Sequence, residues 1–183
     1  EALATARQAA IEVQVSRYLD ALTAFSEPDL ATRVRSMLQG KVELTEADRR
    51  ALSAELVRNL RTTPLLECAV LRDAEGGVLA STRPAQGGDT LDARVFRDAL
   101  QGESISPPIE IEGRWRVDLV RPITGDGGAV LAVLQLRKFA DLLLAIAGDA
   151  RGLGTSGETV LGMRVDAHIR FLLPTRLAPG LSL

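Results

Sequence analysis

The sequence of 183 residues has only one cysteine, Cys68, and only one histidine, His168. A single cysteine excludes an internal disulfide framework and a cysteine-rich zinc site, and a single histidine excludes a metal centre with two histidine ligands. No nucleophile–base pair or metal-binding set can be assembled from the other residues. We therefore predict no catalytic residue, no metal and no cofactor, which leaves binding, sensing or assembly as the class of function.

A surplus of charge of one sign is also missing. The 22 Lys and Arg residues nearly balance the 24 Asp and Glu residues, and the formal net charge is -2. A nucleic-acid-binding domain would concentrate a basic surplus on one face, so we predict no nucleic-acid partner. The hydrophobic fraction of 46% is sufficient for a packed core.

The sequence contains no apolar run of 18 residues, so it predicts no transmembrane helix within this chain. No signal peptide is present either. The first residue is Glu1, which is compatible with a segment that follows a membrane anchor and equally with a trimmed cytosolic domain.

Apolar spacing predicts three helices at the start of the chain. The first carries a stripe of residues spaced by three and four over about three heptads, with the polar Gln8 in one slot. Its apolar members are Ala4, Ile11, Val15, Tyr18, Leu22 and Phe25. A short helix is predicted over 29–39, and a third begins at Thr45, where Thr45 and Asp48 resemble a capping box.

The pattern then changes to strands separated by turn residues. Five strands are predicted, over 66–71, 78–82, 104–111, 114–123 and 129–136. A short helix capped by Thr90 lies between the second and third strands, and a helix over 138–150 follows the fifth. A further pair is predicted over 158–165 and 169–173. Hairpin connections indicate an antiparallel sheet, and hence an α+β fold with the first helix across the sheet.

The strand predicted over 114–121 alternates between apolar and charged side chains. Because successive side chains of a strand point to opposite faces, one face of this strand is charged. That face carries Arg114, Arg116 and Asp118, which can bind a small carboxylate or zwitterion through bidentate hydrogen bonds. Arg83 and Arg121 are weaker candidates for the same ligand-binding pocket. The alternative is a solvated sheet face with local ion pairs.

Other residues that attract attention have ordinary explanations. The segment 152–159 (GLGTSGET) contains G-x-G-x-x-G, but a phosphate loop follows a strand and precedes a helix, and here the predicted order is reversed. Glu158 would also repel a phosphate. We interpret His168 as a surface residue near the last turn, and Cys68 as a small buried apolar residue.

Three segments carry a family resemblance. They are LRDAEGGVLAST over 71–82, the stretch from Arg121-Pro122-Ile123 to Leu134 with its glycine-rich turn, and GLGTSGETVL over 152–161, followed by FLLPTRL over 171–177. In this order they resemble the extracytoplasmic Cache sensor domains, including double Cache domains, of bacterial transmembrane receptors, which have a PAS-like fold.

The resemblance implies a PAS-like Cache fold: a five-stranded antiparallel sheet with a long N-terminal helix, plus the first strands of a truncated second module. Residues 1–62 would form the N-terminal helix and helical segment. Residues 63–150 would form a membrane-distal Cache module, and residues 151–183 the start of a membrane-proximal one. Trp115 and Tyr18 are the sole tryptophan and tyrosine, so the aromatic amino-acid-binding signature of some double Cache domains is not evident.

The function implied is extracytoplasmic ligand sensing for a membrane-anchored receptor, with a sensor histidine kinase as the first choice and a periplasmic location. The expected partner is a small molecule such as a carboxylate or amino acid. The alternative is a ligand-free structural dimerisation module of a receptor such as a diguanylate cyclase or chemoreceptor. The stripe on the first helix either packs on the sheet or continues as a seam with a second copy, so we also predict a homodimer through this helix.

Overall fold

The computed structural model describes residues 2–26, 29–39, 43–63, 66–83, 90–149, 162–165 and 168–171. They form an α+β fold with a long N-terminal helix and an antiparallel sheet, as predicted. The chain divides into two compact units, one of residues 18–139 and one of residues 1–17 and 140–183. The unit of residues 18–139 contains the sheet and all five candidate ligand-binding residues.

Three helices precede the sheet: α1 (Ala2–Ser26), α2 (Asp29–Leu38) and α3 (Glu46–Thr62). The predicted capping box at the start of α3 is present. The Thr45 side chain accepts a hydrogen bond from the Asp48 amide, and the Asp48 carboxylate accepts one from the Thr45 amide. This cap satisfies backbone N–H groups that the first turn of a helix leaves without intrahelical partners.

The apolar stripe of α1 is buried only in part. Its last three members, at positions 18, 22 and 25, are buried, which agrees with packing of this end of the helix. Nearer the N-terminus the most buried side chains are the polar Arg7 and Gln14, whereas Ile11 and Val15 are half-buried. The apolar stripe therefore predicted the position of the helix in the sequence correctly, but it did not predict which face of the first half of the helix is buried.

The sheet is antiparallel and six-stranded, with the order β2-β1-β6-β5-β3 and with β4 also paired to β5. Its strands are β1 (Leu66–Arg72), β2 (Val78–Ser81), β3 (Ser104–Ile105), β4 (Ile109–Ile111), β5 (Arg114–Thr124) and β6 (Val130–Phe139). The strand predicted over 104–111 is thus two short strands. Pro107 and Pro108 separate them because a proline has no N–H to donate to the ladder.

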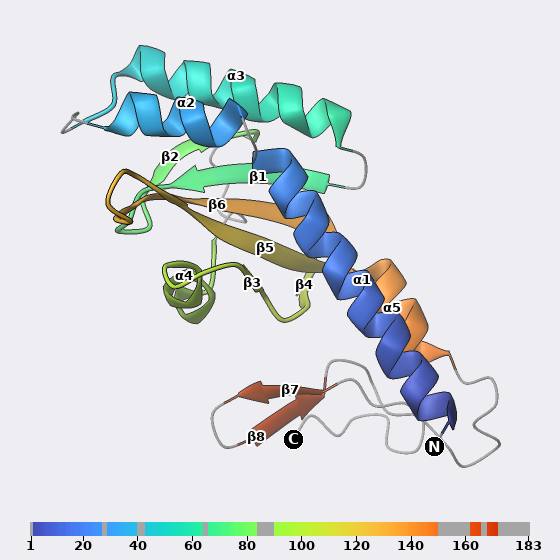
Figure 1. Cartoon of the computed structure of the whole chain (residues 1–183). Coiled ribbons are helices and arrows are strands. Elements are labelled where there is room, and N and C mark those ends of the chain that lie inside the picture. The colour runs from blue at the N-terminus through green and yellow to red at the C-terminus, as the bar shows by residue number, and fades with distance from the viewer. Residues whose placement is uncertain are drawn as a thin grey trace. The chain divides into compact units, whose positions relative to one another are not determined.

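Helices cover both sides of this sheet (Figure 1). Helices α2 and α3 lie over one side, and α4 (Ala93–Ala99) lies over the other, which we call the α4 side. Val95 and Ala99 of α4 pack on Val120 and Val133 of the central strands and form a buried apolar cluster. The helix cap is Asp92, whose carboxylate accepts hydrogen bonds from the amides of residues 94 and 95, so the prediction of Thr90 as the cap was wrong.

The second unit contains α5 (Asp141–Gly148) and a hairpin of β7 (Gly162–Val165) and β8 (His168–Phe171). Strand β6 continues to Phe139, so α5 begins three residues later than predicted. The hairpin agrees with the last predicted strand pair, and His168 is the first residue of β8. The glycine-rich segment 152–159 lies outside the described residues. The predicted domain boundaries after residues 62 and 150 stay a prediction.

Candidate functional site

The alternation of β5 assigns its charged side chains to the α4 side of the sheet. Val120, which packs under α4, has the same strand parity as Arg116 and Asp118. Directly across the β5–β6 ladder, Asp118 pairs with Arg137 and Val120 pairs with Gln135. The α4 side therefore carries a row of polar and charged side chains next to the apolar cluster.

An ion pair between Asp118 and Arg137 occupies the centre of this row. The Asp118 carboxylate accepts hydrogen bonds from Arg137 Nε at 2.8 Å and Nη2 at 3.0 Å. The two residues are only 1% and 2% exposed, and Arg137 Nη2 also donates to the Thr90 carbonyl at 3.3 Å. A bidentate geometry of this kind is the arrangement that offsets the desolvation of two charges most effectively.

A second ion-paired group centres on Glu67 of β1. Arg116 donates to the Glu67 carboxylate from Nε at 2.6 Å and from Nη2 at 3.1 Å, and Arg83 donates to it from Nη2 at 2.8 Å. Arg116 also donates to the Ile111 carbonyl. The β1–β6 register shifts between Leu66 and Cys68. At such a shift the side chains of a strand no longer alternate strictly between the two faces, so Glu67 can lie on the same side as Arg116.

The pKa of Glu67 reflects two opposing effects. Burial of the carboxylate is the largest single effect and raises the pKa. The hydrogen bonds from Arg116 and Arg83 and the attraction of their positive charges together outweigh burial, so the pKa lies below its ordinary value of 4.5. Glu67 is therefore ionised at neutral pH.

The third polar contact of the α4 side joins Gln135 to Arg72. Arg72 Nε donates to Gln135 Oε1 at 3.0 Å, and Arg72 Nη1 donates to the Gly76 carbonyl at 3.1 Å. Because a guanidinium cannot accept a hydrogen bond, this contact fixes which end of the amide is the oxygen. Gln135 Nε2 is buried and has no hydrogen-bond acceptor among the residues that the structure describes.

The structure brings three of the five predicted ligand-binding residues together and places the other two in separate surroundings. Arg116 and Asp118 lie in the buried row of the α4 side, and Arg83 joins Arg116 through Glu67. Arg114 is exposed at the start of β5, and its guanidinium lies 3.4 Å from the centroid of the Phe139 ring. Arg121 has the opposite parity.

Arg121 connects two other parts of its unit. It donates to Ser26 Oγ at 2.8 Å, at the end of α1, and forms an ion pair with Glu103 at 3.2 Å, just before β3. Its contacts thus differ from those of Arg116 and Asp118, although the sequence pattern grouped all three.

Four functional-site candidates were missed: Glu67, Arg72, Gln135 and Arg137. Residues 135 and 137 share the parity of Val133, so an extended fifth strand with its alternation would have placed them on the α4 side. Glu67 lies at a register shift, and nothing in the sequence marks such a shift. The local ion pairs of the alternative are present on this face, but Arg116 and Asp118 are buried and not solvated, whereas Arg114 is exposed.

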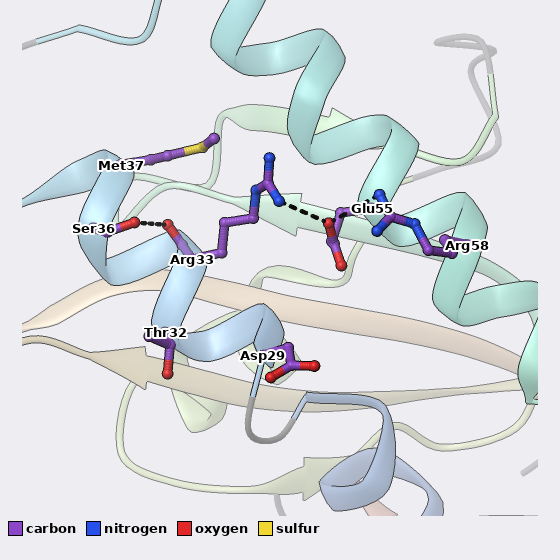
Figure 2. A pocket seen from close by; sticks show the side chains of 7 residues that line it. All are labelled: Asp29, Thr32, Arg33, Ser36, Met37, Glu55 and Arg58. Carbon is purple, nitrogen blue, oxygen red and sulfur yellow. Dashed lines mark hydrogen bonds and ion pairs between the residues drawn. The ribbon is translucent and has the colours of Figure 1, made fainter.

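One groove in the described part of the structure lies elsewhere, between α2 and α3 (Figure 2). Its volume is about 610 Å³, and it is lined by Asp29, Thr32, Arg33, Ser36, Met37, Glu55 and Arg58. None of the predicted ligand-binding residues lines it. In the described part of the chain, no three His, Cys, Asp or Glu side chains are grouped so that they could hold a metal ion, and no helix is long and apolar enough to cross a membrane.

Comparison with known proteins identifies the fold class. No protein-family model matches the chain, and no curated protein matches it significantly. Solved structures do match. The sensory domain of the Campylobacter jejuni chemoreceptor Tlp3 has a TM-score of 0.60 at 17% identity, over 80% of this chain and 62% of that domain. The chain thus spans less than two thirds of the Tlp3 domain.

Two further structures extend the match along the chain. The ligand-binding domain of the Pseudomonas fluorescens chemoreceptor CtaA has a TM-score of 0.55 at 15% identity, over 94% of this chain and 66% of that domain. The extracellular domain of the putative histidine kinase mmHK1S-Z2 has a TM-score of 0.55 at 14% identity, over 99% and 75%. The fold is therefore that of Cache-like sensor domains, as the sequence resemblance implied.

We expect the Asp118–Arg137 pair to be essential for stability. Asp118→Ala leaves a buried guanidinium without its carboxylate and should lower the free energy of unfolding by about 3–5 kcal/mol. Urea unfolding measures this, with Glu110→Ala on the exposed part of β4 as a control that should change it by less than about 0.5 kcal/mol. A loss below about 1 kcal/mol for Asp118→Ala would show that the pair is not a buried ionic contact.

We also expect the Glu67 contacts to make stability depend on pH. Because the folded pKa is below the unfolded one, their contribution is complete above about pH 4.5 and is lost as the pH falls through the folded pKa. Urea unfolding of the native protein and of Glu67→Gln, at steps between about pH 7 and pH 3, should show a stability gap that narrows in acid. A gap of constant size over this range would contradict the lowered pKa.

Proposed function

We propose that the chain is an extracytoplasmic sensor domain of a bacterial membrane receptor, and that a small molecule binds on the α4 side of its sheet. The observation that carries the proposal is Gln135 Nε2, a buried donor with no acceptor in the described part of the structure. A buried polar group without a partner costs free energy, so a native protein tends to supply one. A ligand oxygen would supply it here.

The surroundings of Gln135 define the class of ligand. On one side along β6 lies Val133, which belongs to the apolar cluster under α4, and on the other lies Arg137 with its partner Asp118. The surroundings of Gln135 thus change from apolar to charged along β6. A ligand that fits them has a carboxylate or carbonyl oxygen at Gln135 and a short apolar chain toward Val120 and Val133. Small carboxylates and apolar amino acids have both parts.

The compared proteins support this class. Structures of the Tlp3 domain contain L-norvaline, L-valine or isoleucine, and the CtaA domain contains L-isoleucine. Each of these ligands combines a carboxylate with an apolar side chain. The likeness in fold supports a ligand of this class for the present chain, and the α4 side offers complementary groups.

Within this proposal the predicted residues take different roles. Arg116 and Asp118 are paired to Glu67 and Arg137, so they position the buried row and hold its charges rather than clamp the ligand alone. Arg83 links to the same row through Glu67. Arg114 and Arg121 remain part of the proposed five-residue set only as supports of the strand that carries the site.

The parent protein and its architecture follow the same proposal. Residues 63–150 would be the membrane-distal module and 151–183 the start of a membrane-proximal one, preceded by the helical segment 1–62. The parent would be anchored in the inner membrane with this domain in the periplasm. The match to the putative histidine kinase domain supports a sensor kinase as the parent, and the matches to Tlp3 and CtaA support a chemoreceptor.

Binding and its location can be tested with one variant. A thermal-shift screen of small carboxylates and amino acids should find a compound that stabilises the protein by about 2.7 kcal/mol at a hundred times its dissociation constant. Gln135→Glu keeps the shape and the acceptor for Arg72 but replaces the Nε2 donor by an oxygen. We expect it to weaken binding of that compound about tenfold or more.

The matched control is Gln101→Glu, the same change of charge at an exposed position. Calorimetric titration of both variants with the compound found in the screen measures the difference. If both variants weakened binding equally, or if Gln135→Glu bound the compound with native affinity, the ligand would not bind on the α4 side. A screen without any stabilising compound would count against ligand sensing and in favour of the structural alternative.

The structural alternative rests on a different observation. Val13 of α1 is 53% exposed, which is unusual for an apolar side chain in the middle of a long helix. We propose that α1 also pairs with α1 of a second copy. Val13→Asp should then shift sedimentation at high protein concentration from dimer toward monomer, whereas Ala54→Asp, at an exposed position of α3, should not. A concentration-independent monomer in the native protein would rule out this dimer for the isolated domain.

A further inference from the structure

The groove between α2 and α3 differs from the α4 side in how its charges are paired. Figure 2 shows Arg33 reaching from α2 and Arg58 from α3 toward the same carboxylate, that of Glu55. Arg33 Nη1 lies 3.3 Å and Arg58 Nη2 lies 3.2 Å from Glu55 Oε2. Both distances are longer than those of charge-assisted hydrogen bonds, which are about 2.7–2.9 Å.

Glu55 is the buried element of the groove. Its side chain is 8% exposed, yet within the described residues Oε2 accepts no hydrogen bond of good geometry. The side chains of Arg33 and Arg58 are 46% and 66% exposed. Each guanidinium has five N–H donors, and the only polar side-chain contact that the structure gives either group in the described part is its ion pair with Glu55.

The arrangement leaves a local surplus of positive charge. Two guanidinium groups share one carboxylate, so the cluster of Arg33, Arg58 and Glu55 has a charge of +1, whereas the groove lining as a whole, with Asp29, is neutral. Asp29 also lines the groove, at the start of α2, but it forms no ion pair within 4.0 Å of either arginine. Ser36 lies on the same helix face, and its hydroxyl donates to the Arg33 carbonyl.

We propose that this groove is a second ligand site and binds a small monovalent carboxylate anion. Its oxygens would accept hydrogen bonds from Arg33 and Arg58, which Glu55 holds beside each other against their mutual repulsion. A monoanion neutralises the cluster, whereas a dianion would leave a net negative charge next to Glu55 and Asp29. The site is independent of the proposed site on the α4 side, because the two share no residue.

Acetate is the probe for this proposal. Addition of sodium acetate at constant ionic strength, with sodium chloride as the exchanged salt, should shift the Nε–Hε NMR signals of Arg33 and Arg58 with a saturable dependence on concentration. Arg58→Gln, which changes a side chain that is 66% exposed, should weaken acetate binding about tenfold. Asp29→Asn should strengthen it two- to threefold, since it removes a negative charge from the groove.

Two further variants make the result unambiguous. Arg58→Lys retains the charge but not the planar fork, and should give an intermediate affinity if hydrogen bonds from the guanidinium hold the anion. Arg50→Gln on the exposed side of α3 should leave acetate binding unchanged. Linear shifts without saturation, equal shifts at Arg50, or native affinity in Arg58→Gln would overturn the proposal. If Asp29→Asn bound acetate with native affinity, the charge of the groove would not determine acetate binding, and the electrostatic argument for the site would be wrong.

Discussion

The contact on which the site depends is the buried pair of Asp118 and Arg137. Two charges that are almost completely withdrawn from water are tolerated only when they face each other with good geometry, and here they do so across the β5–β6 ladder. This requirement fixes the register of the two central strands, because a slip of one strand by one residue would turn its charge to the opposite side of the sheet, away from its partner. The register in turn places Gln135 beside Val120 and allows Arg116 to reach Glu67.

Much of the fold followed from the sequence because its signals are local. The capping box at Thr45, the turns rich in glycine and the alternation of β5 each depend on residues close in the chain, and the structure has them. The partners of the charged residues could not be predicted in this way. Glu67 is 49 residues from Arg116 and Arg72 is 63 residues from Gln135, so only the strand order brings them together. The alternation of side chains along a strand predicts which face of the sheet a residue lies on, but it does not predict which residue of another strand lies next to it.

The contacts of Arg121 lie on the other side of the sheet and differ from those of Arg116 and Asp118. On that side Tyr18 of α1 packs its ring 4.6 Å from Lys138 Nζ, and burial lowers the pKa of Lys138. Arg121 lies at the end of α1, where it binds Ser26, and it also holds Glu103 next to β3. Residues 100–103 connect α4 to β3, so in the proposed function a shift of α4 on ligand binding would reach the end of α1 through the side chain of Arg121. Arg121 is thus better suited to coupling than to ligand contact.

The two sets of arginines also differ in what they can offer a ligand. On the α4 side, each guanidinium donates to a carboxylate, an amide oxygen or a backbone carbonyl, and the unused buried donor is the neutral amide of Gln135. A neutral donor selects a ligand by shape and by a single hydrogen bond, so the apolar cluster beside it must supply much of the affinity. In the groove between α2 and α3, two exposed arginine side chains share one carboxylate and, in the further site that we propose, would attract anions with little regard to shape. Under the proposed function, the α4 side is therefore the surface that would distinguish one small molecule from another.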